Sequence, residues 1–223
     1  MKIFLDERLI TFSAMPPAVT APDEWIFRYE SPRQLEAAFL QFEATPHFKA
    51  LTVIDPDKNP DGPSPAEAAF MDLFKRIDAA GGLVTNEKGD LLFIQRLGRW
   101  DLPKGKINRD DYAPGEQHLL TCGSVPPEAA RRAAIREVKE ETGLAQLAIT
   151  GELSSTWHIY TRKEKRILKR TWWFSMETDS NQPLTPQLSE AITSVQWISR
   201  EKIPIVLDDT YGSLREMLRQ LLF

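Results

Sequence analysis

The 223-residue chain contains one cysteine, Cys122, and only three histidines. One cysteine excludes an intrachain disulfide, and one cysteine with three dispersed histidines gives no zinc-binding spacing. No apolar run approaches the roughly 18 residues that a membrane-spanning helix requires. The first residues also lack the long apolar core and cleavage site of a signal peptide. We therefore expect a protein of the reducing cytoplasm that has no membrane partner.

Positive charge is not in excess either. The chain has 28 Lys and Arg against 32 Asp and Glu, a formal net charge of −4, and a pI near 5.5. A polymeric nucleic-acid partner is therefore not expected. The hydrophobic content of 42% and the charged content of 27% are ordinary for a globular protein. The length allows one large or two small domains with a sizeable core.

The pattern of residues 1–79 predicts a separate small α/β domain. Short strands are expected at residues 2–5, 9–12, 25–29 and 51–54. Two helices are expected after Ser31-Pro32 and Ser64-Pro65, which supply an N-cap and a proline at the first helical position. The second helix is expected to run through Ile77. No catalytic group of residues is present here, so packing or dimerisation is the expected role, with a homodimer through this domain as the expected assembly.

A helix predicted over residues 127–142 carries three glutamates in regular spacing. The helix is rich in alanine and is ended by Gly143. Glu137, Glu140 and Glu141 stand at positions i, i+3 and i+4 and therefore share one face. Like charges at this spacing repel by a few tenths of a kcal/mol per pair. A hard divalent cation would compensate them because it prefers oxygen ligands, whereas a solvated acidic face is the alternative.

The residues around this helix resemble the Nudix hydrolase family. A basic glycine turn, WDLPKGK at residues 100–106, precedes the helix, which ends in REVKEETGL at residues 136–144. The family box runs Gly, five residues, Glu, seven residues, then Arg-Glu-apolar-x-Glu-Glu-x-Gly-apolar. The second half matches here at every fixed position. The resemblance implies an α/β Nudix fold, a mixed sheet sandwiched by helices, in residues 80–223.

The first half of the box departs from the family pattern. Glu128 stands eight residues before Arg136, as the family requires, but 22 residues separate Gly105 from Glu128 where the family has five. Glu116 is the alternative for this acidic position. If the helix already includes Glu128, nine residues before Glu137, its side chain points to the opposite side, and it joins the metal only if the chain bends there.

The resemblance implies that the box binds a divalent cation, Mg²⁺ or alternatively Mn²⁺, which lowers the pKa of a bound water. The implied metal ligands are Glu137, Glu140, Glu141, Glu128 and the carbonyl of Gly105. Glu137, or Glu190 outside the box, is implied as the base or as the group that orients the water. Arg136 is implied to orient a box glutamate.

Basic residues are implied to neutralise the phosphates of a small-molecule substrate. Those before the box are Arg96, Arg99, Lys104 and Lys106. A predicted hairpin over residues 155–176 is rich in aromatics and contributes His158, Lys165, Arg166, Lys169 and Trp173. Solvated cations and tryptophans packed in the core are the alternative. The polar insertion at about residues 108–125 is expected to be a surface loop or a lid beside the site.

The expected activity is hydrolysis of a phosphoanhydride bond. The hairpin pattern resembles Nudix enzymes that act on dinucleoside polyphosphates and diphosphoinositol polyphosphates. The same chemistry on ADP-ribose, a nucleotide sugar or an ordinary or oxidised nucleoside triphosphate is the alternative. A second alternative is a non-catalytic Nudix domain that binds a nucleotide and regulates a partner, although the complete carboxylate set of residues 136–144 argues against it.

Overall fold

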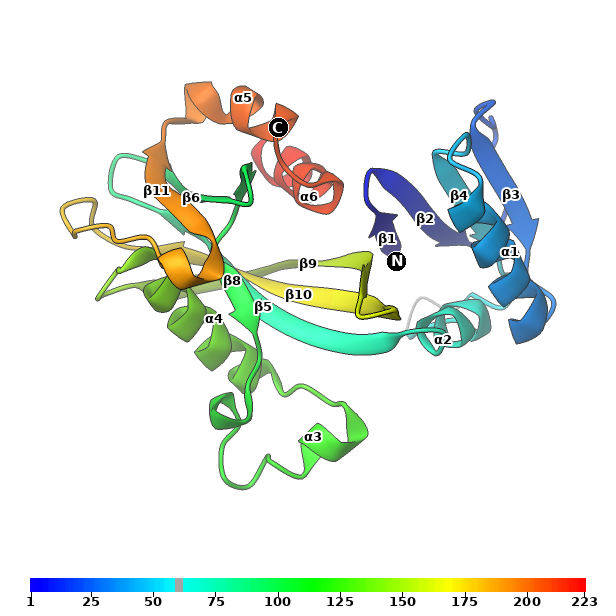
Figure 1. Ribbon diagram of the computed structural model, residues 1–223, viewed down its shortest axis with the longest axis horizontal. Helices are drawn as coiled ribbons and strands as arrows, with labels where there is room; N and C mark the ends of the chain where they lie inside the picture. Colours follow the sequence, from blue (N-terminus) through cyan, green and yellow to red (C-terminus); the bar gives the residue numbers. More distant parts are fainter. Residues whose placement is uncertain (59–61) are drawn as a thin grey trace. The chain divides into compact units, whose positions relative to one another are not determined.

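The computed structural model describes residues 1–58 and 62–223, with the backbone alone described for residues 121 and 122. The chain divides into two compact units (Figure 1). The N-terminal unit comprises residues 1–76 and 157–169, and the C-terminal unit comprises residues 77–156 and 170–223. Residues 157–169 are the outer part of a long hairpin, so the N-terminal unit is built from two separate pieces of the chain.

The N-terminal unit contains a sheet with two helices. Its strands are β1 (Lys2–Leu5), β2 (Arg8–Ser13), β3 (Glu24–Arg28) and β4 (Ala50–Ile54), in the order β1-β2-β4-β3. Strand β1 also pairs in parallel with the hairpin at His158 and Ile159. The helices are α1 (Pro32–Ala44) and α2 (Pro65–Met71), and they begin after the predicted N-caps Ser31 and Ser64.

Aromatic rings fill the core of the N-terminal unit. Phe39 and Phe70 are buried, and their ring centroids lie 5.3 Å apart in an edge-to-face arrangement, which aromatic pairs favour. The second helix does not run through Ile77 as predicted. It ends at Met71, and strand β5 (Lys75–Thr85) begins four residues later, because pairing in a sheet overrides a weak helical preference.

The C-terminal unit is a mixed sheet between helices, which confirms the predicted fold class. Its further strands are β6 (Leu91–Arg96), β7 (Arg99–Asp101), β8 (Lys104–Lys106), β9 (Ala148–Arg162), β10 (Lys165–Glu177) and β11 (Ile192–Ile198). The order is β11-β6-β5-β10-β9, with β7 paired to β6 and β8 paired to β5. The hairpin expected at residues 155–176 is formed by β9 and β10.

Helices cover both faces of this sheet (Figure 1). Helix α4 (Pro127–Thr142) packs on one face, where Val84 and Leu92 join its alanines in one core cluster. Helices α5 (Ile203–Asp208) and α6 (Gly212–Leu222) pack on the other, against Leu83 and Phe93. Neighbouring residues of one strand thus face opposite helices, as the period of two in a strand requires. In the described part of the chain no helix is long and apolar enough to cross a membrane.

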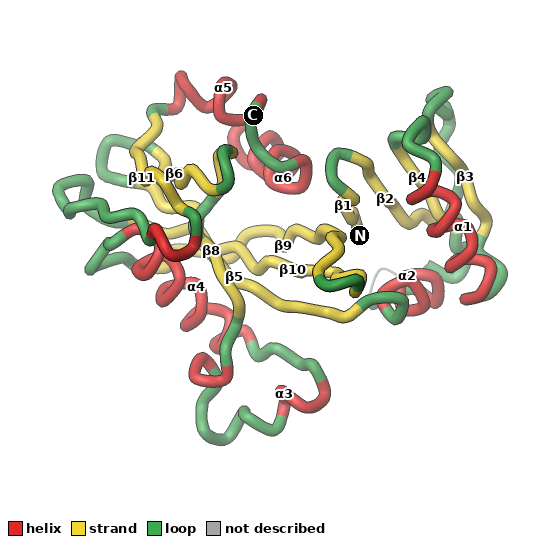
Figure 2. Tube along the Cα trace, in the orientation of Figure 1, coloured by secondary structure: helices red, strands yellow, loops and turns green. Residues whose placement is uncertain are grey.

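The insertion between β8 and α4 is an excursion made mostly of loop (Figure 2). It contains two short helical segments, η1 (Arg109–Asp111) and α3 (Leu119–Cys122). Two further short segments, η2 (Leu188–Glu190) and η3 (Arg200–Lys202), flank β11. The first residues of the insertion and the start of η2 reach the end of α4, where the predicted carboxylates lie.

Candidate active site

Arg136 organises the carboxylates on α4. Its Nε and Nη2 donate to the two carboxylate oxygens of Asp111 at 2.9 and 2.8 Å. Its Nη1 donates to Glu137 Oε1 at 2.7 Å and to Glu140 Oε2 at 3.1 Å, and Nη2 also donates to the carbonyl of Lys106 at 3.0 Å. A guanidinium has five N–H donors, and these contacts use all of them. The hydrogen bonds to Asp111 raise the pKa of Arg136 more than its other contacts do.

Asp111 occupies the acidic position that the sequence left open between Glu128 and Glu116. Its side chain is only 4% exposed. It stands six residues after Gly105, which is the spacing of the family box, with Asp in place of Glu. The insertion therefore follows this acid, and 24 residues separate Asp111 from Arg136 where the family has seven. The spacing is present in the sequence, but aspartate stands where the family pattern has glutamate.

The structure does not bring Glu128 to the other carboxylates. Helix α4 is continuous from its first residue, so a side chain nine residues before Glu137 points to the opposite side. Glu128 is 68% exposed and pairs with Arg131 at 3.6 Å. Glu116 pairs with Arg132 at 2.8 Å. The expected metal role of Glu128 is thereby corrected.

Glu141 is the most deeply buried carboxylate of the site. Its side chain is 2% exposed, its Oε2 accepts a hydrogen bond of 2.8 Å from the backbone N–H of Lys104, and its Oε1 lies 3.5 Å from Arg96 Nη1. Burial raises the pKa of Glu141 to about 7, although Lys104 and Arg96 act in the opposite direction. Burial also raises the pKa of Glu137, against the lowering effect of Arg136.

Arg96 links Glu141 to a glutamate far away in the sequence. While its Nη1 faces Glu141, its Nη2 donates to Glu190 Oε2 at 2.8 Å. Glu190 ends the short helical segment η2, and its side chain is 52% exposed. The structure thus brings the predicted helper glutamate beside the box. It also shows Arg96 engaged with carboxylates.

Gly105 allows α4 to approach β8 closely. A Cβ atom at this position would lie 1.9 Å from Glu137 Oε2, so any side chain would displace the glutamate. Gly105 pairs with Ala80 of β5. On one side of this pair, Gly82 N–H donates to the Pro103 carbonyl. On the other side, Ile107 N–H donates to the Asp78 carbonyl. Alternation along an antiparallel ladder then directs the Gly105 carbonyl to β5.

The backbone on the opposite edge of β8 belongs to Lys104 and Lys106. The Lys104 N–H donates to Glu141, and the Lys106 carbonyl accepts from Arg136. In a strand the N–H and the carbonyl of one residue point to the same side. The Lys104 carbonyl therefore points to the same edge of β8 as the Lys104 N–H. The Gly105 carbonyl, which was expected to bind the metal, therefore points away from the carboxylates, and the Lys104 carbonyl lies on their side.

The predicted basic residues before the box differ in their surroundings. Lys104 is buried, with its Nζ 3.1 Å from Asp101 Oδ2, and in the described part of the chain no acceptor meets hydrogen-bond geometry with Nζ. The side chains of Lys106 and Arg99 are exposed. The guanidinium of Arg99 lies 5.3 Å from the centre of the Tyr211 ring.

The residues predicted on the hairpin divide between the two units. The N-terminal unit contains four of them: His158, Lys165, Arg166 and Lys169. Within that unit Arg166 forms an ion pair of 2.6 Å with Glu43 of α1. Trp173 belongs to the C-terminal unit, is 3% exposed, and donates from Nε1 to Thr156 Oγ1 at 2.9 Å. Its ring packs in the core, which corrects the expectation that it contacts substrate.

The carboxylate donors suit a hard divalent cation, although they do not converge as they stand. Among the described residues, no three carboxylate, histidine or cysteine side chains are arranged around a common metal position. The glutamates turn instead toward Arg136 and Arg96. Glu137, Glu140 and Glu141 nevertheless offer oxygen ligands from one face of the helix. Glu141 is buried with a long ion pair of 3.5 Å, so a cation would compensate its charge.

The NUDIX domain family model matches residues 75–221. The chain belongs to the Nudix family. It is an enzyme, a Nudix hydrolase that acts on acid anhydrides in phosphorus-containing compounds. Enzymes of this family generally use divalent metals.

Several solved structures are similar to about two thirds of this chain. The MutT protein from Methanosarcina mazei Go1 is 22% identical over 66% of this chain and 93% of that chain, with a TM-score of 0.45. The C. elegans Ap4A hydrolase in a binary complex is 22% identical over 65% of this chain and 94% of that chain, with a TM-score of 0.43. The NUDIX domain of Shewanella oneidensis NrtR complexed with ADP ribose is 17% identical over 67% of this chain and 90% of that chain, with a TM-score of 0.43.

Proposed function

We propose that this protein is a Mg²⁺-dependent pyrophosphohydrolase, with Mn²⁺ as the alternative cation, that acts on a dinucleoside polyphosphate or a diphosphoinositol polyphosphate. The observation that carries the proposal is the pairing of two arginines with the carboxylates. Arg136 contacts Glu137 and Glu140, and Arg96 contacts Glu141 and Glu190. These ion pairs support the proposal because they gather four carboxylates near the last turns of α4.

Glu137, Glu140 and Glu141 would hold the cation. When bound, it supplies positive charge to the leaving phosphate and lowers the pKa of water. Attack of water on a phosphorus atom breaks the bond to the bridging oxygen, and a glutamate accepts the proton from the water. Glu190 suits this role because it is exposed and held by Arg96, and Glu137 is the other candidate.

Basic side chains support a substrate with several phosphates. Four of them lie within residues 96–106: Arg96, Arg99, Lys104 and Lys106. Buried Lys104 and half-buried Arg96 adjoin Glu141, and the exposed Lys106 adjoins the Arg136 network through its carbonyl. A substrate contact by the hairpin residues His158, Lys165, Arg166 and Lys169 stays a prediction from the sequence, and Arg166 is already paired with Glu43. ADP-ribose, nucleotide sugars and ordinary or oxidised nucleoside triphosphates are the alternative substrates.

The proposal gives residues 1–79 a separate role. They form a dimerisation domain and add no catalytic residue to residues 80–223. The whole protein acts on a small molecule in the cytoplasm, where the solitary Cys122 stays reduced. Neither a nucleic-acid polymer nor a membrane is a proposed partner.

Turnover over a panel of substrates tests this proposal. Purified protein with Mg²⁺ is offered diadenosine polyphosphates, diphosphoinositol polyphosphates, ADP-ribose, and nucleoside triphosphates including oxidised ones. The Glu141→Gln variant serves as the inactive control. One polyphosphate far ahead of the other substrates, and lost in the control, supports the proposal. A clear preference for ADP-ribose or a triphosphate favours the alternative, and metal-independent or absent turnover with every substrate overturns both.

A further inference from the structure

Strand β3 is the edge of the N-terminal sheet. It pairs on one side with β4, in parallel, over its whole length from Glu24 to Arg28. The Asp23 carbonyl accepts from Lys49 N–H at 2.7 Å, and Tyr29 N–H donates to the Ile54 carbonyl at 2.8 Å. Odd-numbered residues therefore bond to β4. Because successive residues of a strand alternate, the backbone groups of Ile26 and Arg28 point to the open edge.

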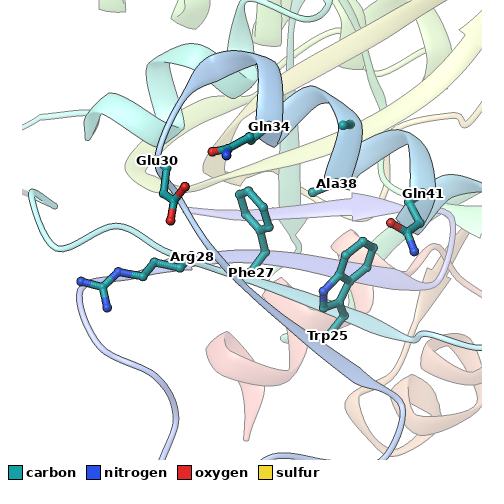
Figure 3. Close-up of a pocket in the computed structure, with 8 residues that line it drawn as sticks. Trp25, Phe27, Arg28, Glu30, Gln34, Ala38 and Gln41 are labelled. Atoms are coloured by element: carbon teal, nitrogen blue, oxygen red, sulfur yellow. The ribbon is translucent and has the colours of Figure 1, made fainter.

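A groove beside this strand is lined by aromatic and uncharged polar side chains together with the charged residues Arg28 and Glu30. It has a volume of about 310 Å³, and Figure 3 shows Trp25 and Phe27 of β3 directed toward α1. Helix α1 contributes Gln34, Ala37, Ala38 and Gln41 to the lining. Both aromatic side chains are only half-buried. The edge strand and the groove together form one face that offers backbone hydrogen bonds and apolar surface.

The sequence of β3, Glu24-Trp25-Ile26-Phe27-Arg28, is complementary to itself in the antiparallel direction. If two copies of the strand pair about a two-fold axis at Ile26, Glu24 of each copy lies opposite Arg28 of the other. On the other face of the sheet, Trp25 lies opposite Phe27. Opposite charges and aromatic pairs that lie directly across a ladder stabilise it. A parallel partner of the same sequence would instead place like charges together.

The backbone groups at the open edge of β3 can form hydrogen bonds in this same antiparallel register. Ile26, whose N–H and carbonyl point to the open edge, meets Ile26 of the second copy and exchanges both hydrogen bonds with it. Arg28 N–H meets the Glu24 carbonyl of the second copy. Glu24 N–H already donates to the Ala21 carbonyl at 3.0 Å, so the ladder ends there. The two-fold axis stands perpendicular to the sheet and keeps both α1 helices on the same face.

We propose that a second copy of this chain docks on β3, edge to edge and antiparallel, next to the groove beside α1. This inference rests on the proposed homodimer through residues 1–79 and names its contact. An isologous contact of this kind closes after two copies. It also removes an exposed strand edge, which soluble proteins generally protect.

Sedimentation equilibrium of the full chain tests the proposal. The chain has a mass of 25.4 kDa, and we expect the wild type to sediment at twice that value. Glu24→Arg and Arg28→Glu each place like charges across the ladder twice, and each alone should associate at least about tenfold more weakly. When the two variants are mixed, both pairs become opposite in charge, and dimers should return. Arg33→Glu, the same charge change on an exposed residue of α1 outside the groove lining, should leave the dimer intact.

Each outcome decides the proposal. Recovery of dimers only in the mixture supports it, and a misfolded variant could not give that result. A wild-type dimer that both variants retain overturns the β3 contact while leaving a homodimer in place. A wild type that is monomeric at every concentration overturns the homodimer as well, and an extended segment of another protein becomes the better occupant. Turnover of the substrate panel is read separately, so failure of the dimer is distinguishable from failure of the proposed hydrolase.

Discussion

Asp111 holds Arg136 by a bidentate ion pair, with both carboxylate oxygens within 2.9 Å of guanidinium nitrogens. The acid ends the short helical segment η1, and the arginine comes from the third turn of α4. The pair orients the guanidinium, which then contacts Glu137 and Glu140. Asp111 therefore acts on the carboxylates through Arg136 and is a positioning residue.

Asp111→Ala should lower kcat while leaving KM nearly unchanged. Loss of an acid that orients site residues typically lowers activity about 10- to 100-fold. The free energy of unfolding should fall by roughly 2 kcal/mol, less than for a fully buried pair because Arg136 is 28% exposed. Steady-state kinetics and urea denaturation measure the two effects. Asp110→Ala removes the exposed neighbouring acid and should change neither quantity, so equal effects of the two substitutions would contradict the assignment.

Gly105→Ala should impair catalysis because the added Cβ would lie 1.9 Å from Glu137 Oε2. The glutamate or the helix must move, and we expect kcat to fall at least about tenfold. Gly115→Ala is the matched control, since a Cβ there would meet no atom within 4 Å. Turnover under saturating substrate compares the two variants. Normal activity of Gly105→Ala would show that Glu137 tolerates displacement and is not needed where it stands.

Glu140→Gln and Glu141→Gln should each lower the rate at least about a hundredfold, because each removes a carboxylate ligand of the cation. Neither change should unfold the protein, since glutamine has nearly the same shape. Turnover with Mg²⁺, together with the thermal melting temperature, provides the check. Normal turnover by both variants would eliminate the assignment of these glutamates to the metal.

The stability of the metal-free protein should depend on the ionisation of Glu141. Its pKa is raised from 4.5 to about 7 by burial, so the folded protein binds this proton more tightly than the unfolded chain does. The stabilisation is complete below pH 4.5 and is lost as the pH rises through about 7. At about 1.4 kcal/mol per pH unit the loss is roughly 3 kcal/mol.

Glu141→Gln keeps this side chain neutral and should lack that loss. With a chelator present, the melting temperature of the variant should therefore exceed that of the wild type at about pH 8, and the two should be closer at about pH 5. Addition of Mg²⁺ at the higher pH should stabilise the wild type more than the variant. If the difference in melting temperature between the wild type and the variant is the same at both pH values, the pKa of Glu141 is not raised.

Arg96 and Glu190 should act as one unit in a double-mutant cycle. If Arg96 serves mainly to hold Glu190 at 2.8 Å, the combined Arg96→Ala and Glu190→Gln variant should be little worse than the more affected single variant. If Arg96 acts independently on substrate phosphates, the two losses in kcat/KM should multiply. The four rates of the cycle distinguish the two roles.

The sequence predicted the carboxylate face of α4 because that prediction depends only on helical spacing. The layered α/β fold likewise followed from the match to a known family box. The direction of the Gly105 carbonyl depends on strand register, which spacing along one strand does not determine. The burial of Trp173 could not be inferred either, because alternation shows that Trp172 and Trp173 face opposite ways but not which face meets α5 and α6. The placement of Glu190 depends on a loop that returns from far along the chain.

Residues 157–169 make the packing of the N-terminal unit depend on the β9–β10 hairpin. Ile159 and Leu168, at the outer part of the β9–β10 hairpin, are buried in the same core cluster as Phe39 of the N-terminal unit. A genetic exchange that moved residues 80–223 alone would leave these two apolar side chains without their neighbours. The N-terminal unit is therefore not an extension joined at a single point. The unit and the hairpin depend on each other's packing, and removal of residues 1–79 should expose Ile159 and Leu168 to water.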